Sequence, residues 1–143
     1  MANKIAGKLI NLYCRYYAIT GGQYWPVVCV RNSGLTLQKT SIDATSNCGQ
    51  DTVPGSDDDS MEIEVLYTAQ PKDAGVLDAN DMHTIYAAEA IAEFKYADDA
   101  DTPVNFGFAF EGRVLSWAAA ADATDLLTAS MTIEPKGGIT KLI

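Results

Sequence analysis

The stretch MEIEVLYT, residues 61–68, decides the fold class because apolar side chains recur at every second position. One side carries Met61, Ile63, Val65 and Tyr67, and the other carries Glu62, Glu64, Leu66 and Thr68. Side chains alternate across a β-strand, so this period of two predicts a half-buried strand. Glu62 and Glu64 are then expected together on the outward-facing side of that strand.

The segment before this strand, residues 40–60, has almost no apolar periodicity. It is rich in Ser, Thr, Asp, Asn, Gly and Pro, and near its end it carries the acidic run Asp57, Asp58 and Asp59. It is longer than the usual connection in a compact domain, and such connections are commonly functional or mobile. We therefore predict a long loop inserted between two strands.

Upstream of this loop, the sequence predicts a meander of short strands joined by tight turns. Strands are expected at residues 9–17, 24–31 and 35–38, and turns at residues 20–23 and 32–34. Pro26 indicates that the second strand starts late or lies at a sheet edge, because proline cannot donate a ladder hydrogen bond.

One helix is predicted downstream, at residues 80–96. Its apolar stripe consists of Ile85, Ala88, Ile91 and Ala92. The stretch is rich in alanine and lacks glycine and proline, which favours a helix. Asp78 and Asp81 lie near its start and Lys95 near its end, as the helix dipole prefers.

The last third of the chain returns to the period of two. Strands are expected at residues 105–110, 113–117 and 127–134, and turns at residues 111–112 and 135–138. Strands grouped around one helix predict a mainly β fold. We expect a β-sandwich or barrel formed by one domain over residues 1–143, with the helix packed on one side.

Charge and hydropathy exclude several functions. The chain has 143 residues, a formal net charge of −9 and an isoelectric point near 4.3. A polyanion gains nothing from counterion release on DNA, so specific nucleic-acid binding is not expected. There is no apolar run long enough to span a bilayer and no signal-peptide pattern, which predicts synthesis in the cytoplasm and no membrane association.

The sequence contains few residues suited to catalysis or to metal binding. It has one histidine, His83, and three cysteines at irregular spacing, Cys14, Cys29 and Cys48. We expect Cys14 and Cys29 to be small buried residues on strands. No catalytic motif, cofactor site or zinc-ligand pattern is present, so an enzyme is not expected. A calcium site at residues 57–59 remains an alternative, although the spacing is not that of a calcium loop.

Two further groups of residues have alternative interpretations. Glu62 and Glu64 could form a glycosidase-like pair, but a solvent- or lumen-facing strand has the same pattern. The early aromatic residues are Tyr13, Tyr17, Tyr24 and Trp25. They pack the sheet or fill a subunit contact, or they stack against a ligand in a barrel mouth.

The order of these elements resembles the phage major tail protein family. The similar segments are residues 41–47 (SIDATSN), residues 53–56 (VPGS), residues 102–108 (TPVNFGF), residues 110–112 (FEG) and residues 128–133 (TASMTI). Together they extend over roughly residues 5–137. Each segment is short, and the order of all of them is a stronger signal than any single one.

The resemblance implies a tail-tube fold whose copies form hexameric rings, stacked into a tube through which DNA is ejected. The long loop would contact the next subunit or ring, with Ile42, Asp43, Ala44, Thr45, Cys48, Pro54 and Gly55 as candidates. Tape-measure and tail-terminator proteins would be partners, and the protein would reside in the virion tail after synthesis in the host cytoplasm. From the net charge we further hypothesise an acidic lumen lined by Asp57, Asp58, Asp59, Glu62 and Glu64.

Two alternatives to a phage tail tube stay open. One is a tube protein of a contractile injection or secretion system, which would have much the same fold. The other is a small-ligand-binding β-barrel, which would need an enclosed cavity within one monomer.

Overall fold

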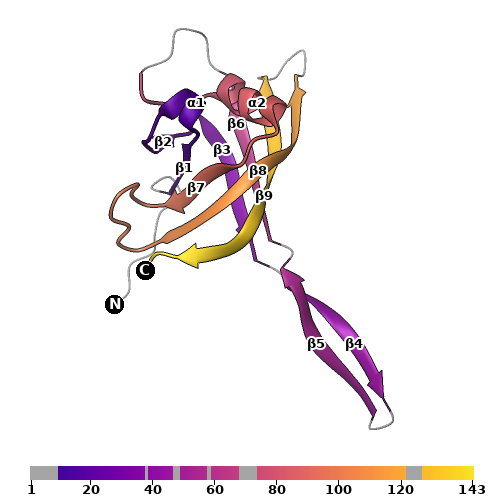
Figure 1. The fold of residues 1–143 in the computed structure, drawn as a ribbon. Helices are drawn as coiled ribbons and strands as arrows, with labels where there is room; N and C mark the ends of the chain where they lie inside the picture. Colours follow the sequence, from indigo (N-terminus) through magenta and orange to yellow (C-terminus); the bar gives the residue numbers. More distant parts are fainter. Residues whose placement is uncertain (1–9, 38, 47–48, 58, 68–73, 122–126) are drawn as a thin grey trace.

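The computed structural model describes residues 10–37, 39–46, 49–57, 59–67, 74–121 and 127–143, with only the backbone described for residues 39–57. The chain forms a curled sheet, from which a thin two-stranded arm extends (Figure 1). The elements are β1 (Asn11–Arg15), α1 (Tyr17–Thr20), β2 (Trp25–Pro26), β3 (Val30–Thr36), β4 (Lys39–Ser46), β5 (Gly49–Asp57), β6 (Ser60–Leu66), α2 (Ala79–Ala88), β7 (Ala92–Ala97), β8 (Gly107–Ala120) and β9 (Thr128–Lys141).

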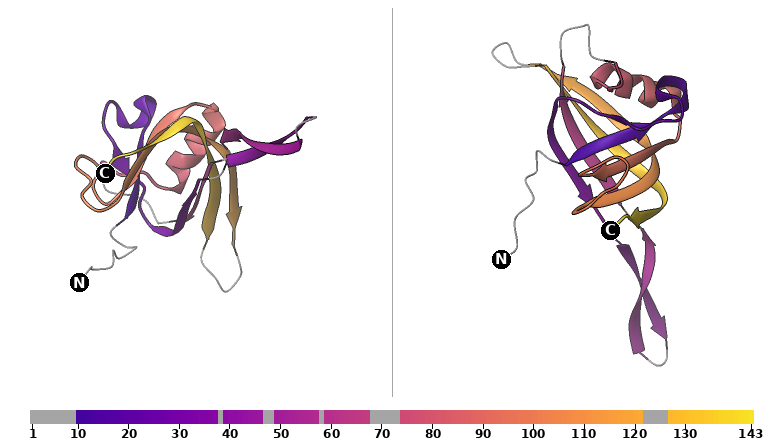
Figure 2. Two further views of the ribbon diagram at one scale, coloured as in Figure 1. Left: turned by 90° about the horizontal axis from the view of Figure 1, so that it is seen from below. Right: turned by 90° about the vertical axis from the view of Figure 1, so that its left-hand side faces the viewer.

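The main sheet has seven strands in the order β2-β1-β7-β8-β9-β6-β3, and neighbouring strands are antiparallel. The sheet curls back on itself, as the two views of Figure 2 show. The side-chain oxygens of Ser33 on β3 and Tyr96 on β7 are 2.7 Å apart, although these strands are not neighbours in the sheet. The predicted sandwich- or barrel-like fold is confirmed.

The core lies inside this curl. Met61, Ile63 and Val65 of β6 are buried, as their alternation with Glu62 and Glu64 predicts. Each is in register with a buried residue of β9: Ile133, Met131 and Ala129, respectively. On the neighbouring strands β7 and β8, the rings of Phe94 and Phe110 are in register and stack with centroids 5.5 Å apart.

Helix α2 covers one side of the curled sheet, close to β8 (Figure 1). It begins with a capping box: the Asp81 backbone N–H donates to Asp78 Oδ1 at 2.9 Å, and the Asp78 N–H donates to Asp81 Oδ2 at 3.1 Å. Met82 and Ile85 are buried beneath the helix. The predicted helix on one side of the sheet is therefore confirmed.

The predicted extent of this helix, residues 80–96, is wrong. The helix ends at Ala88, Glu89 adopts a left-handed conformation (φ 53°), and Ala92–Ala97 form β7. β7 is an inner strand between β1 and β8, and it buries Phe94 completely. Burial of an aromatic side chain within a sheet outweighs the few tenths of a kcal/mol by which helix propensities differ.

Three predicted turns, at residues 32–34, 111–112 and 135–138, lie instead inside β3, β8 and β9. β8 and β9 are each 14 residues long, and their pairing continues past these positions with register shifts, which are β-bulges. Between Ala109 and Glu111 the register shifts opposite the part of β9 that contains Gly137, whose φ is +77°. Glycine here produces a bulge, not the end of a strand.

Two predictions near the start of the chain also need correction. The strand predicted at residues 24–31 is interrupted, because β2 contains only Trp25 and Pro26. Cys29 has a positive φ of 60° and is exposed, so its predicted burial is wrong. Cys14 is buried as predicted, and burial raises the pKa of its thiol to about 12.

The segment predicted as a loop at residues 40–60 is mainly a β-hairpin. β4 and β5 pair in antiparallel register from Lys39↔Asp57 to Ser46↔Gly49. The hairpin forms the arm that extends from the ends of β3 and β6 (Figures 1 and 2). Its polar composition gives no periodic signal, because a two-stranded arm has no core of its own to cover.

Gly112 gives a test of the close approach between β8 and β9. A Cβ at this position would lie 2.8 Å from the backbone oxygen of Glu134 and 3.2 Å from Ile133 Cγ2. We expect Gly112→Ala to lower the free energy of unfolding by about 1–3 kcal/mol, because the strand backbone must shift to accept the methyl group. Urea unfolding measures this change, and Gly34→Ala, where a Cβ meets nothing within 4 Å, is the matched control.

Candidate assembly surfaces

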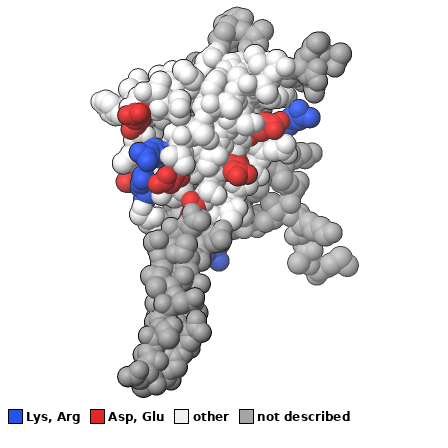
Figure 3. All heavy atoms as spheres, turned by 90° about the vertical axis from the view of Figure 1, so that its right-hand side faces the viewer, with Lys and Arg blue, Asp and Glu red and all other residues white. Residues whose placement is uncertain are grey.

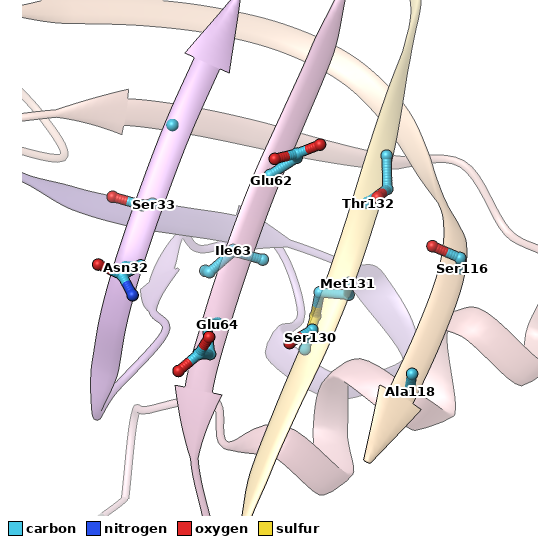
Figure 4. Close-up of a pocket in the computed structure, with 11 residues that line it drawn as sticks. Asn32, Ser33, Glu62, Ile63, Glu64, Ser116, Ala118, Ser130, Met131 and Thr132 are labelled. Carbon is cyan, nitrogen blue, oxygen red and sulfur yellow. The ribbon is translucent and has the colours of Figure 1, made fainter. Parts of the chain in front are cut away.

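The outer side of β3, β6, β9 and β8 forms a shallow concave face, which we call the polar face. Two rows of residues cross it in register: Gly34, Glu62, Thr132 and Ser116 in one row, and Asn32, Glu64, Ser130 and Ala118 in the next. These side chains surround a hollow of about 490 Å³. Figure 4 shows them on the four adjacent strands, with the two carboxylates on β6.

The two rows are chemically uniform, because their side chains other than Glu62 and Glu64 are short and uncharged. The next row on the same side holds an ion-paired group, in which Arg113 and Lys136 flank Glu134. The Arg31 guanidinium lies 3.7 Å from a carboxylate oxygen of Glu64, while Glu62 is exposed. In Figure 3, most charged side chains stand in small groups in which acidic and basic ones lie side by side, on a mainly uncharged surface. Such a surface offers a polyanion no array of cations to bind.

The predicted acidic residues are only partly brought together. Glu62 and Glu64 lie on the polar face as neighbours on one strand. Asp59 is half-buried just before β6, and Asp57 ends β5, where side chains are not described. Asp58 lies outside the described residues. Among the described residues, no cluster of three His, Cys, Asp or Glu side chains that could hold a metal ion is found.

The four-stranded part of the sheet that carries the polar face has a free edge on each side within the described part of the chain. β3 pairs with β6 on one side alone. β7 pairs with β8 only as far as Gly112, so beyond this residue β8 pairs with β9 alone. Unpaired edges present rows of N–H and C=O groups that readily accept another strand. Residues 113–120 of β8 and the whole of β3 are therefore candidate joining edges.

A second cluster lies on the opposite part of the sheet, around Tyr24. The Tyr24 hydroxyl donates to Glu93 at 3.2 Å, and Arg15 forms an ion pair with the same carboxylate. Arg15 and Lys95 lie over the Tyr24 ring, 4.7 and 4.5 Å from its centroid. Partial burial raises the pKa of Tyr24, so its hydroxyl stays protonated and remains a donor.

The Tyr24 cluster was not predicted from the sequence. β1 and β7 place Arg15 opposite Glu93, but their pairing becomes visible only in the folded sheet. The early aromatic residues do not gather in one site: Tyr17 is exposed on α1, while Trp25 packs against the core. Some of these aromatic residues pack against the core, and others lie on the surface.

His83 stands apart from both surfaces. Its ring makes an edge contact with Trp117 of β8, with centroids 4.7 Å apart. This contact holds α2 against the sheet.

No helix in the described residues is long and apolar enough to cross a membrane.

The candidate inter-subunit residues lie on the arm. Ile42, Asp43, Ala44 and Thr45 belong to β4, and Pro54 and Gly55 belong to β5. Cys48 lies outside the described residues. The structure places the arm away from the body of the molecule, and its two strands pair only with each other (Figure 1).

A curled antiparallel sheet with one flanking helix and a projecting hairpin arm is the fold of tail-tube subunits, as the sequence resemblance predicts. A chain of the SPP1 tail tube shares it with a TM-score of 0.74 and 16% identity, covering 97% of this chain and 79% of that chain. A chain from the tail of an empty gene transfer agent particle, refined with C6 symmetry, gives a TM-score of 0.69 at 16% identity, covering 98% of this chain and 100% of that chain.

The same fold occurs in a third kind of assembly. A chain of the sheath–tube complex of an extracellular contractile injection system matches with a TM-score of 0.63 and 9% identity, covering 96% of this chain and 90% of that chain. No protein-family model matches the sequence, and neither does any curated protein. At these identities the likeness establishes the fold.

Proposed function

We propose that this protein is the structural subunit of a bacteriophage tail tube, acting by assembly and not by catalysis. The observation that carries the proposal is the four-stranded face formed by β3, β6, β9 and β8, with a free edge on each side and one uniform polar surface. This arrangement suits a repeating wall better than a substrate pocket. The shared fold of assembled tails supports it.

The direction of the strands supports ring closure. β3, β6, β9 and β8 alternate in direction, so β3 runs antiparallel to β8. A rotation about an axis close to the strand direction brings β3 of one copy beside β8 of the next, and the joint is again antiparallel. A closed barrel of these strands then removes the free edges of β3 and β8. The C6 symmetry of the gene transfer agent tail supports hexameric rings.

In such rings the polar face forms the lumen. Its opposite side packs against the core and α2, so the side with Glu62 and Glu64 faces the axis. Carboxylates repel phosphates weakly within the screening length of about 8–10 Å at physiological salt. Short side chains and an absence of cation arrays would let DNA slide along the wall during ejection.

The arm is proposed to join subunits or rings. It extends beyond the body, and its backbone is already paired as a hairpin. A preformed arm orders fewer residues on assembly than a flexible loop would, which favours tight association. Ile42, Asp43, Ala44 and Thr45 on β4 remain the candidate contacts, with Pro54 and Gly55 on β5 and Cys48 between the strands. Tape-measure and tail-terminator proteins would bind the finished tube within the virion tail.

Electron microscopy of the purified protein tests the proposal. We expect concentrated protein to form rings or tubes with a central channel, and light scattering to show a mass that rises with concentration. A reconstruction should place Glu62 and Glu64 on the channel wall. A protein that stays monomeric at all concentrations, or that places these carboxylates on the outer wall, would contradict the proposal.

The contractile injection system is a second candidate, favoured by the match to its sheath–tube complex. A contractile sheath must bind the outer surface of its tube. Binding of a purified sheath protein to assembled tubes would therefore favour the injection system over the phage tail tube. The small-ligand barrel is less favoured, because the inside of the curl is filled by packed side chains such as Phe94, Met61 and Leu12.

Charge reversal tests the lumen assignment. We expect tubes of Glu62→Lys to retain short double-stranded DNA at low salt, because each ring then adds a ring of cations to the wall. The parent tubes should retain none. Fluorescence anisotropy of labelled DNA, measured at several salt concentrations, gives the result.

Glu111→Lys is the matched control for charge. Glu111 is exposed on β8, opposite Glu93, and lies beside the Tyr24 cluster, away from the two rows that contain Glu62 and Glu64. Its variant changes the net charge equally but leaves these two rows unchanged. Equal DNA retention by the two variants would show that the effect comes from total charge and not from the lumen.

A further inference from the structure

A hollow lies where the free edge of β8 meets the end of α2. It is lined by Tyr86, Ala87, Glu89, Arg113, Val114 and Leu115 and has a volume of about 350 Å³. Leu115 is the extra residue of a bulge, because the register passes from Val114↔Ile133 to Ser116↔Thr132. The bulge leaves Leu115 49% exposed, and Tyr86 beside it is 37% exposed. The monomer thus leaves two large apolar side chains uncovered at one free edge.

The other free edge ends in an exposed leucine. Leu37 follows β3 directly and is 54% exposed. Leu35 is in register with the buried Met61, so it points to the core side of the sheet. Alternation places Leu37 on that same side, which is the side that carries α2. Each free edge therefore has uncovered apolar surface on the same side of the sheet.

One row of register partners joins the two free edges, and Leu37 and Leu115 lie a short distance beyond its two ends, on opposite sides of the row. Leu35, Met61, Ile133 and Val114 form one row across the four strands. In a ring, this row of one copy continues into the next copy with a stagger of a few residues, set by the strand tilt of a barrel. Leu37 of one copy then comes beside Leu115 of its neighbour, at the point where the unpaired part of β8 begins.

We propose that Leu37 of one copy inserts into the hollow between α2 and β8 of the next, as the anchor of the ring interface. The proposal rests on the proposed tube function and adds the contact that fixes the register between copies. An apolar side chain in a pocket beside paired backbone is the usual form of an interface hot spot. A single anchor matters here because paired edges alone can slip along one another.

Cysteine cross-linking tests this contact. In a Cys29→Ser, Cys48→Ser background, we expect Leu37→Cys combined with Leu115→Cys to give disulfide-linked ladders up to a full ring after assembly and mild oxidation. An equimolar mixture of the two single variants should give linked pairs and nothing longer. Either single variant alone should stay unlinked, because its new thiol has no facing partner.

Val104→Cys combined with Leu115→Cys is the control for random collision. Val104 is 71% exposed, more than Leu37, and lies in the loop between β7 and β8. This pair should not cross-link. Tubes that form normally but yield no Leu37–Leu115 ladder would overturn the contact and leave the tube function intact. Parent protein that never forms rings would overturn both.

Assembly of a charged variant gives an independent readout. We expect Leu37→Asp to raise the concentration needed for tube formation at least tenfold, because a carboxylate would be buried in the hollow. Val104→Asp should assemble at the parent concentration. Since Leu37 is exposed in the monomer, its circular dichroism and thermal unfolding should not change. Tubes of Leu37→Asp at the parent concentration would contradict the proposal.

Discussion

Replacement of Phe94 by alanine is expected to lower the free energy of unfolding by about 3–5 kcal/mol, the range for loss of a buried aromatic ring. Phe94 is 0% exposed and stacks on Phe110. It stands on β7, between β1 and β8, so its ring holds together the two parts of the curled sheet. Because small domains have only about 5–15 kcal/mol in total, the variant should be partly unfolded near body temperature.

Urea unfolding followed by circular dichroism measures this loss. Val104→Ala is the control, because its side chain is exposed and should change the unfolding free energy by less than about 0.5 kcal/mol. A loss below about 1 kcal/mol for Phe94→Ala would mean that the core is not packed as described. The result also tests β7 itself, since a helix at these residues would place the ring differently.

Removal of the arm is expected to abolish assembly and leave the monomer folded. The arm can be removed without changing the pairing of β3 with β6, because Thr36 and Ser60 are in register where the arm joins the body. In the variant, residues 39–57 are replaced by a short Gly-Ser-Gly link, so that Leu37 is kept. The free energy of unfolding should change by less than about 1 kcal/mol, because β4 and β5 form a sheet of their own that pairs with no strand of the main sheet.

Removal of the arm should instead weaken polymerisation of the subunit. We expect the concentration needed for tubes to rise at least about a hundredfold, equivalent to about 2.7 kcal/mol lost per subunit contact. Turbidity and electron microscopy over a concentration series measure it. Replacement of residues 122–126 by a Gly-Ser-Gly link of the same kind is the control. Tubes of the armless chain at the parent concentration would show that the arm has no role in assembly.

Local patterns predicted much of the fold. The alternation at residues 61–68 correctly predicts β6 and its buried face, and the acidic start of α2 correctly predicts its beginning near Asp78. The errors come from segments where local preference and tertiary packing compete. Ala92–Ala97 has a composition suited to a helix, yet it forms a strand because Phe94 can be buried only there. Gly112 and Gly137 read as turns but lie within long paired strands.

The sequence alone determined that this is a mainly β chain with an acidic charge, without catalytic motifs, and with Glu62 and Glu64 on one strand face. These properties follow from composition and from alternation along the chain, which neighbouring residues set by themselves. Only the tertiary structure decided which strands are neighbours, where the free edges beside the polar face lie, and that Leu37 and Leu115 stand near opposite ends of one row. Strand pairing joins residues far apart in the chain through backbone hydrogen bonds that every residue type can make, so no local pattern specifies it.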